Sequence, residues 1–376
     1  MTRDPTSSPA FGLGWLEASG PHADIVLSTR VRLARNLQGH AFGPRLRDGE
    51  PDRVAALVRE AAARTAMLQG GAAVDLVELP HLSRQVLMER HLISREMAGG
   101  AGGEPPRGAA LFMDSQEQTG LMVNEEDHLR LQALLSGFRL YDAYRLVDQL
   151  DEELGSRLPF AYHHEFGYLT SCPTNVGTGL RASIFVHLPG LVLTKEIGRV
   201  LQGIGQVGLT FRGLYGEGSE VVGNFFQISN QTTLGKSEED LIDHLQKIVR
   251  QVIHYELQAR SVLMRDAPTV IEDKIWRAYG LLRYARSLSF EEVMNLLSGV
   301  RLGVSMKLLP GPSVYTLNKI MIHAQSAHLQ RAAGRPLSEA ESDLHRANYV
   351  RRVLATEGEI PPAEGGSDDG AGTQEA

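Results

Sequence analysis

The only cysteine in this 376-residue chain, Cys172, stands before a proline in a turn built from small and hydroxyl residues. Residues 170–183 read TSCPTNVGTGLRAS, and they continue directly into an apolar run at residues 184–188. A cysteine kept for packing more usually lies inside an apolar helix or strand. Here small residues let backbone N–H groups approach a ligand, and Arg181 begins a strand as a fixed cation. From composition alone, a binding turn and an ordinary turn with a buried, inert cysteine are both open.

The chain has the composition of a globular protein. With 42% apolar and 22% charged residues, it is long enough for two or more domains with full cores. No run approaches the roughly 18 consecutive apolar residues of a membrane span, and the N-terminal residues lack the apolar region of a signal peptide. A single cysteine excludes an intrachain disulfide, which fits a reducing compartment. We therefore expect a cytoplasmic protein without membrane association.

Negative charge is concentrated at the C-terminal end. Residues 357–376 contain six acids and no base, so leaving them out changes the net charge from −7 to −1. This polar, glycine-rich stretch is predicted to be a disordered acidic tail. The rest of the chain is near neutral and shows no basic stripe, which argues against nucleic acid as a partner.

Two arginines alternate along an early apolar segment. Residues 25–36 read IVLSTRVRLARN, and a strand that begins at Ile25 would point Arg30 and Arg32 to the same face. Two guanidinium groups with hydroxyls beside them suit an anion. A half-exposed strand with solvated arginines is the alternative.

The segments after this strand are predicted to mix helices and strands. Apolar spacing favours helices at residues 51–69 and 81–97, and composition favours a flexible loop at 98–108. Two short apolar runs, at 110–113 and 120–123, are typical of a hairpin.

Three acids, at residues 125–127, follow the predicted hairpin. We expect them to lead into a long amphipathic helix that ends at Leu154, where one or two of them would complement the helix dipole. The dipole does not explain Arg130, which follows one turn later and could reach the same site.

The remaining segments favour one more strand and then helices to the end. Four glycines lie at residues 208–220, close to Glu217, and predict a loop that can close over a ligand. Ser237 begins a capping box before a helix. The other expected elements are a helix at 189–204, a strand at 224–230, helices at 289–297, 314–331 and 339–354, and loops at 299–312 and 334–336.

Three common site motifs do not fit. Gly235-Lys236-Ser237 ends like a P-loop, but Asn230 stands where that motif needs glycine. Val221 likewise interrupts a dinucleotide fingerprint. The histidines lack the spacing of a zinc site, so we expect no metal held by the protein alone.

Taken together, the remaining motifs resemble the ATP:guanido phosphotransferase family, the phosphagen kinases and their bacterial relatives. The resemblance covers residues 20–255, and its motifs occur in one order. They are STRVR at 28–32, NEEDHLR at 124–130, CPTNVGT at 172–178 with RAS at 181–183, and RG at 212–213 with GE at 216–217. The resemblance implies transfer of the γ-phosphoryl group of ATP to a guanidinium nitrogen, with Mg²⁺ on the phosphates.

The resemblance also implies the fold and its division into domains. We expect an α+β catalytic domain at residues 24–258, with an antiparallel sheet flanked by helices, and an all-α C-terminal domain at 259–356 for dimerisation or regulation. An irregular segment at 1–23 would precede them, and the disordered tail at 357–376 would follow. Phosphagen kinases place a helical domain ahead of the STRVR strand, whereas here helical sequence follows the catalytic domain. This order is similar to that of the bacterial protein arginine kinases.

Matched position by position, the resemblance implies roles for individual residues. Glu126 and Glu217 would orient the acceptor guanidinium, with Glu126 as the base, and Cys172 would lie beside it. Five arginines would clamp the phosphates, while Glu125 and Asp127 would support the site. The residues implied for ATP are Ser28, Thr29, Arg30, Val31, Arg32, His91, Arg130, Arg181, Ala182, Ser183, Ile184, Phe185, Arg212, Gly213, Leu214, Tyr215 and Gly216.

One motif departs from the family pattern. Protein arginine kinases carry an Arg-Asp-x-x-Arg-Ala motif that is understood to bind phosphoarginine, and the aligned residues here are Ser342, Asp343, Arg346 and Ala347. Serine in place of the first arginine removes a bidentate contact from a phosphate pocket. We expect this degenerate site to bind phosphoarginine weakly or not at all.

The resemblance thus predicts a stress-response kinase that phosphorylates arginine side chains in proteins. Its expected partners are arginine-containing protein substrates, a Clp-type unfoldase or protease, a transcriptional repressor, and a second copy of the chain in a dimer. A kinase of free arginine or another small guanidine is one alternative. A mainly non-catalytic adaptor is another, although the intact carboxylates and arginines argue against it.

Overall fold

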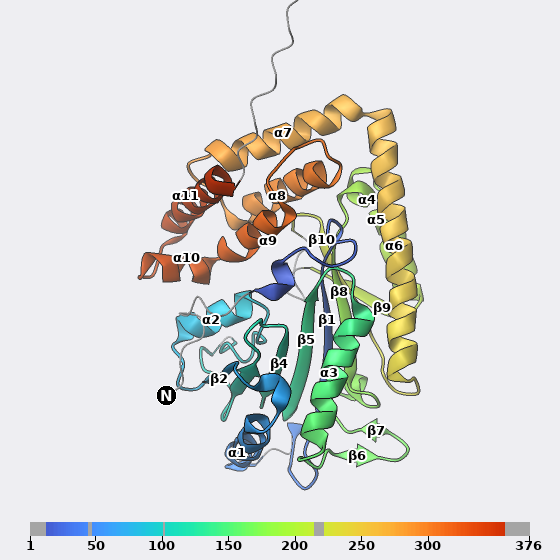
Figure 1. Cartoon of the computed structure of the whole chain (residues 1–376), viewed down its shortest axis with the longest axis vertical. Coiled ribbons are helices and arrows are strands. Elements are labelled where there is room, and N and C mark those ends of the chain that lie inside the picture. The colour runs from blue at the N-terminus through green and yellow to red at the C-terminus, as the bar shows by residue number, and fades with distance from the viewer. Residues whose placement is uncertain (1–12, 44–46, 101, 214–221, 358–376) are drawn as a thin grey trace, which may run out of the picture.

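The computed structural model describes residues 13–43, 47–100, 102–213 and 222–357 (Figure 1). Its main element is an eight-stranded sheet in the order β2-β3-β4-β5-β1-β8-β10-β9. Every neighbouring pair in this sheet is antiparallel. The strands are β1 (Val26–Arg35), β2 (Ala72–Asp75), β3 (Ala110–Met113), β4 (Thr119–Val123), β5 (Leu129–Ser136), β8 (Leu180–His187), β9 (Leu209–Arg212) and β10 (Phe225–Asn230), with β6 (Tyr162–His163) and β7 (Gly167–Tyr168) in a separate hairpin.

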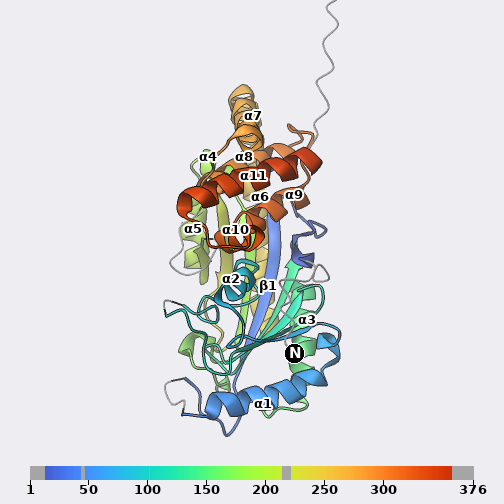
Figure 2. The same ribbon diagram turned by 90° about the vertical axis from the view of Figure 1, so that its left-hand side faces the viewer.

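Helices flank the sheet, and the regular elements described after its last strand are all helices. The helices are α1 (Glu50–Ala63), α2 (His81–Glu89), α3 (Leu140–Gly155), α4 (Pro189–Leu193), α5 (Ile197–Gln206), α6 (Glu238–Asp266), α7 (Pro268–Tyr284), α8 (Phe290–Ser305), α9 (Val314–His323), α10 (Ser326–Ala333) and α11 (Glu339–Glu357). Helix α6 runs along the sheet toward α7 to α11, which gather at one end of the molecule (Figures 1 and 2). The expected α+β fold with a helical C-terminal region is confirmed.

The two faces of the sheet differ because side chains alternate along each strand. On β1 the residues Val31 and Leu33 point into the largest apolar core, and Leu131 on β5 and Ile184 on β8 do the same. Helices α1, α3 and α6 cover this face. The opposite face of β1 presents Arg30 and Arg32, the two positions of the strand that are not fully buried.

Among the described residues, apolar clusters pack on the arginine-bearing face at both of its ends. At one end a core cluster joins Leu27, Leu134, Phe185 and Phe225 of the sheet to helices α7, α8, α9 and α11. At the other end a third cluster packs α2 and the segment after it against β2, β3 and β4. The polar middle of this face therefore lies between two apolar supports.

The structure corrects the segment that follows the three acids. Residues expected to be helical form strand β5, and α3 begins only at Leu140. Leu129, Leu131 and Ala133 alternate with polar residues, so the segment fits a strand buried on one face as well as it fits a helix. These residues adopt the strand conformation because they pair with β4 on one side and with β1 on the other. The acids thus lie in the turn between β4 and β5, and the helix-dipole interpretation is wrong.

Several helix boundaries also differ from the prediction. Helix α1 ends at Ala63 and α2 at Glu89, and the helix expected at 189–204 is divided into α4 and α5. A break at Ala324 and Gln325 likewise separates α9 from α10. Termination signals of this kind are local backbone conformations that apolar spacing does not reveal.

Helix α8 continues through residues that were expected to form a loop. Its Gly303 lies so close to α7 that an added Cβ would stand 2.3 Å from Cγ2 of Ile275. Gly299 and Gly303 therefore permit close packing of α8 on α7 and do not mark a turn, whereas residues 306–312 form a loop as expected. The predicted capping box is confirmed: Ser237 Oγ accepts from Asp240 N, and Ser237 N donates to the Asp240 carboxylate.

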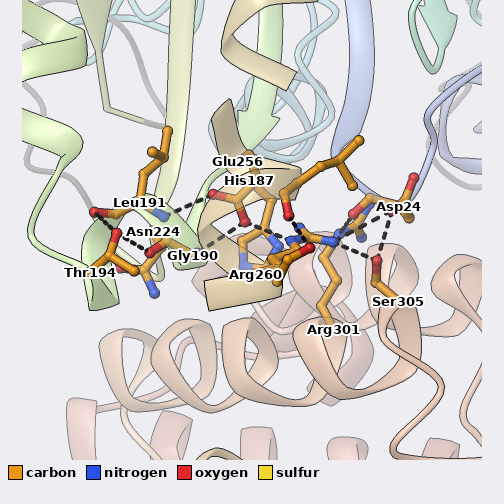
Figure 3. Close-up of polar contacts among 12 residues, drawn as sticks. Asp24, His187, Gly190, Leu191, Thr194, Asn224, Glu256, Arg260, Arg301 and Ser305 are labelled. Atoms are coloured by element: carbon orange, nitrogen blue, oxygen red, sulfur yellow. Dashed lines mark hydrogen bonds and ion pairs between the residues drawn. The ribbon is translucent and has the colours of Figure 1, made fainter. Parts of the chain in front are cut away.

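A buried polar network connects α6, α8 and the start of β1 (Figure 3). The Glu256 carboxylate accepts from the backbone N–H groups of Gly190 and Leu191 at 2.9 and 3.0 Å and from Arg260 Nε at 2.7 Å. Arg260 also contacts Asp24 and donates to Ser305 Oγ. The helical end of the molecule is thus attached to the sheet by charged groups as well as by the apolar core.

Helix α6 continues without a break from Glu238 to Asp266, so a domain division at residue 258 stays a prediction. In the part of the chain that the structure describes, none of the helices has the length and apolarity to cross a membrane.

Candidate active site

Four arginines gather on the polar face of three adjacent strands. Arg30 and Arg32 lie on β1, Arg130 on β5 and Arg181 on β8, and Arg32 stands opposite Arg181 in the strand register. Burial, and then repulsion from Arg130 and Arg181, lower the pKa of Arg30 to about 10. The same causes, together with Arg30 itself, hold the pKa of Arg32 well below its usual range. Such a cluster is stabilised by a bound polyanion.

Neighbouring hydroxyl groups orient one of these arginines. Arg181 Nη2 donates to Ser229 Oγ at 3.2 Å and to Thr210 Oγ1 at 3.5 Å. Arg212 ends β9 opposite Gln227, at the edge of the same face. The five arginines predicted to clamp phosphate thus come from β1, β5, β8 and β9.

The turn between β4 and β5 brings two carboxylates to this cluster. Glu125 Oε1 lies 2.7 Å from Arg130 Nη1, and Glu126 Oε2 lies 3.3 Å from Arg130 Nη2. The Glu125 side chain is buried, whereas that of Glu126 is 47% exposed. Burial, opposed by Arg130 and assisted by Asp127 and Glu125, raises the pKa of Glu126. A carboxylate whose pKa is raised is a better proton acceptor than a free one.

The third acid of the turn connects it to the cysteine segment. Asp127 Oδ1 accepts from Asn36 Nδ2 at 2.7 Å and from Ser171 N at 2.6 Å. Cys172 follows directly, is partly exposed, and its Sγ lies 3.0 Å from Thr174 Oγ1. Asp127 therefore sets the position of Glu126 relative to Cys172.

The cysteine segment is itself held by the sheet. Thr233 Oγ1 donates to Thr174 O and Val176 O, and Arg35 Nη1 donates to Thr178 O. Gly177 has a φ of +112°, and an added Cβ would lie 2.8 Å from Thr233 O. The turn is thus rigidly placed rather than an incidental surface loop.

A pocket extends from the arginines toward the helical end of the molecule. His91 stands in it, and burial followed by the charge of Arg30 lowers the pKa of His91 to about 3. The imidazole is therefore neutral near pH 7. The lining residues are Trp15, Ser28, Arg30, His91, Leu134, Ser183, Phe185 and Gln227.

Three lining residues, Trp15, Leu134 and Gln227, were not identified from the sequence. Leu134 on β5 pairs with Arg30, and Gln227 on β10 pairs with Arg212, so both lie on the polar face. The alternation of side chains could have identified them once the pairing of β5 and β10 was known. Trp15 belongs to the 3₁₀ helix η2 (Gly14–Leu16), and no local pattern connects it with the pocket.

Other residues predicted to bind ATP point elsewhere. The side chains of Val31, Ala182 and Ile184 lie in the core on the opposite face, and Thr29 Oγ1 donates to Gly137 O. Gly213 follows β9, while Leu214, Tyr215, Gly216 and Glu217 lie outside the described residues. No group of three or more His, Cys, Asp or Glu side chains able to hold a metal occurs in the described ranges. Mg²⁺ would therefore be held by nucleotide phosphates and water, which the arginine cluster can accommodate.

The degenerate phosphoarginine motif lies on α11, inside the helical end. Arg346 donates to Ala324 O and Leu288 O at 2.8 Å each, and it pairs with Asp343. Ser342 and Ala347 are buried. In this arrangement the Arg346 guanidinium supports the helical packing.

The chain belongs to the ATP:guanido phosphotransferase family, because residues 53–259 match its C-terminal catalytic domain. Residues 268–363 match the domain described as protein-arginine kinase McsB C-terminal domain. The expected family is thereby confirmed, and it uses ATP with Mg²⁺. Strand β1 precedes the matched catalytic segment but lies in the middle of its sheet.

Curated relatives align along nearly the whole chain. The protein-arginine kinases of Moorella thermoacetica and Symbiobacterium thermophilum are each 47% identical over 91% of this chain, covering 97% and 96% of their own lengths. Among solved structures, the duplicated taurocyamine kinase of Schistosoma mansoni with bound transition state analogue components matches with a TM-score of 0.57 and 25% identity. That match covers 78% of this chain and 41% of the other. A lombricine kinase shares the fold, with a TM-score of 0.55 over 67% of this chain and 72% of its own.

Proposed function

We propose that this chain is a protein-arginine kinase that transfers the γ-phosphoryl group of ATP to arginine side chains in proteins. The principal observation is that one sheet face joins an arginine cluster to a carboxylate turn, which Asp127 links to Cys172. Such a face provides fixed cations for phosphates and fixed anions for a guanidinium acceptor. Alignment with relatives of that activity over 91% of the chain, helices included, supports the proposal.

The arginines would hold the transferred group. Phosphoryl transfer depends mainly on positioning and on electrostatic stabilisation of the three equatorial oxygens. Arg30, Arg32 and Arg181 lie on adjacent paired strands, so they need little reorganisation to meet those oxygens. Bound Mg²⁺ supplies further neutralisation of the phosphate charge.

The carboxylate turn would bind and deprotonate the acceptor. A guanidinium has a pKa above roughly 12 and is a poor nucleophile until a proton is removed. The ion pair of Glu126 with the guanidinium of Arg130 supports this role, because the acceptor carries the same group. In the reaction the N–P bond forms, the bond from γ-phosphorus to the bridging oxygen breaks, and the guanidinium proton passes to Glu126. Glu217 is proposed as the second carboxylate on the strength of the family motif alone.

Cys172 would position the acceptor rather than attack it. Its Sγ stands on a turn that Asp127 and Thr233 hold in place. A thiolate in an electropositive site can accept from a guanidinium N–H. No covalent intermediate on sulfur is needed, because phosphoryl transfer to nitrogen proceeds in line.

The finer assignments form part of the same proposal. The chain acts on folded or unfolded proteins that expose arginine, works in the cytoplasm, and cooperates with a Clp-type protease or a transcriptional repressor. A dimer through the helical region is supported by the exposed apolar side chains of Val270, Leu281 and Tyr284 on α7.

Phosphorus NMR with MgATP and either an arginine-rich unfolded protein or free L-arginine tests the proposal. An acid-labile phosphoramidate signal on the protein alone is expected. A signal on free arginine would reassign the chain to a small-guanidine kinase. Absence of both signals, with ATP unconsumed, would leave the adaptor interpretation. Arg59→Gln, on the exposed outer side of α1, serves as the control variant.

A further inference from the structure

Trp15 lies inside the pocket although it precedes every motif of the family. It is 1% exposed, and its indole contacts the ring of His91 edge to face, with centroids 5.6 Å apart and planes at 71°. Among the described residues, its Nε1 has no hydrogen-bond partner. The indole therefore contributes to the pocket by its shape and by its contact with His91.

His91 lies outside the regular elements, and the indole of Trp15 contacts its ring. His91 follows the C-terminal end of α2 and adopts a φ of +61°, a backbone conformation that few residues other than glycine favour. Its backbone oxygen accepts from Gln132 Nε2 at 3.1 Å, which attaches the main chain to the polar face of the sheet. The imidazole is oriented in part by Trp15.

The C-terminal helices determine where Trp15 lies. Asn318 Nδ2 on α9 donates to Leu16 O at 2.9 Å, and Arg301 Nη1 on α8 donates to Asn318 Oδ1 at 2.6 Å. Arg301 Nη2 also donates to Ala23 O at 2.7 Å, just before β1. Figure 3 shows Arg301 at this junction, beside Asp24 and Ser305.

The apolar packing follows the same route. Trp15, Leu134 and Phe185 line the pocket and belong to one core cluster with Met294 and Leu297 of α8. One wall of the pocket is therefore part of the core of the helical region. Because protein interiors are closely packed, a displacement of α8 or α9 would shift the side chain of Trp15.

We infer that Trp15 is a positioning residue for the nucleotide, which orients His91 and is itself placed by the C-terminal helices through Arg301 and Asn318. The inference rests on the proposed function, in which this pocket receives ATP. It makes the helical region part of the nucleotide site, in addition to the dimerisation proposed for α7.

The chain offers a direct spectroscopic test, because Trp15 and Trp276 are its only tryptophans. Trp276 is 40% exposed on α7, so Trp276→Phe yields a protein whose emission comes from Trp15 alone. Titration of this variant with MgATP is expected to change the emission in a saturable manner, and the midpoint gives the Kd for MgATP. Trp15→Phe, which retains Trp276, is the matched control and should show no change.

Kinetics separate positioning from a merely structural role. Trp15→Phe should raise the KM for ATP by about three- to tenfold, the range expected when an aromatic contact is lost, while kcat changes less than twofold. Asn318→Ala, with Trp15 intact, should raise the same KM and shift the emission of the single-tryptophan protein to longer wavelength. The KM for the protein acceptor should stay unchanged in both.

The inference would be overturned if saturating MgATP left the Trp15 emission unchanged. It would also be overturned if Trp15→Phe had the wild-type KM for ATP. A lowered melting temperature with unchanged KM would do the same, since it would reduce Trp15 to a packing residue. If Trp15→Phe does not fold, the titration of Trp276→Phe decides alone. Failure of the proposed function is distinct: MgATP would alter the emission, but no phosphoarginine would form on any protein.

Discussion

Arg32 on β1 stands directly opposite Arg181 on β8 in the register of two antiparallel strands. Like charges at opposed positions of a sheet are destabilising, and here burial adds a desolvation cost. The sheet keeps both because a polyanion that binds between them recovers the cost. The arrangement of arginines thus favours ligand binding and lowers the stability of the ligand-free protein.

Removing the charge of Arg32 should have opposite effects on the stability and on the activity of the protein. Arg32→Met should raise the free energy of unfolding of the ligand-free protein by about 0.2–1 kcal/mol, since a like-charge contact is lost. The same change should lower kcat/KM by about 10²-fold or more, as expected for a lost transition-state contact. Urea unfolding and steady-state kinetics measure the two effects. Loss of stability in this variant would contradict the repulsion argument, and Arg59→Met on the exposed side of α1 is the control.

The base assignment predicts a dependence on pH. Glu126→Gln should lower kcat by about 10²- to 10⁴-fold with little change in the KM for ATP. Because the pKa of Glu126 is raised by burial, wild-type activity should fall as pH drops through that raised pKa. The pH profile of kcat/KM for the acceptor checks this. A variant that retains the acidic limb would exclude Glu126 as the base.

The buried carboxylate of Glu117 makes the stability of the protein fall as pH rises, whereas the activity is expected to fall as pH drops. Burial raises the pKa of Glu117 to about 7, above its ordinary 4.5, despite the ion pair with Arg90. A raised pKa in the folded state contributes stability that is complete below pH 4.5 and is lost as pH rises to about 7. The loss amounts to a few kcal/mol. Glu117→Gln should flatten the stability profile between these pH values in thermal melts, and an unchanged slope would contradict the assignment.

The polar junction in Figure 3 should be essential for the folded protein. Glu256 is fully buried and accepts from Gly190 N, Leu191 N and Arg260 Nε. Glu256→Ala would leave Arg260 buried without its main partner, at a cost of about 3–5 kcal/mol in the free energy of unfolding. Denaturant melts measure it. Glu272→Ala, at an exposed position of α7, should change stability by less than about 0.5 kcal/mol.

The degenerate motif on α11 predicts weak or absent binding of phosphoarginine. Ser342 supplies no guanidinium, and that of Arg346 is engaged by Leu288 O, Ala324 O and Asp343. Calorimetric titration of the wild-type protein should therefore show no tight binding at this motif. Tight binding that Arg346→Ala abolishes, in a variant shown to be folded by circular dichroism, would refute the prediction.

Local sequence determined those features that depend on a few neighbouring residues. The alternation of Arg30 and Arg32 with apolar residues is enough to place them on one face of a strand. Ser237 and Asp240 are enough to begin α6, because a capping box needs only four residues. The order of the family motifs identified the chemistry before any geometry was known.

Tertiary structure alone decided which distant residues meet. Residues 129–136 fit a strand or a helix, and only pairing with β1 and β4 brings Arg130 beside the arginines of β1. Trp15 enters the pocket because Asn318 donates to the backbone oxygen of the neighbouring Leu16, from which it is separated by 302 positions in the sequence. Strand pairing and buried hydrogen bonds between remote segments depend on the whole chain being folded, and periodicity in a short window carries no information about them.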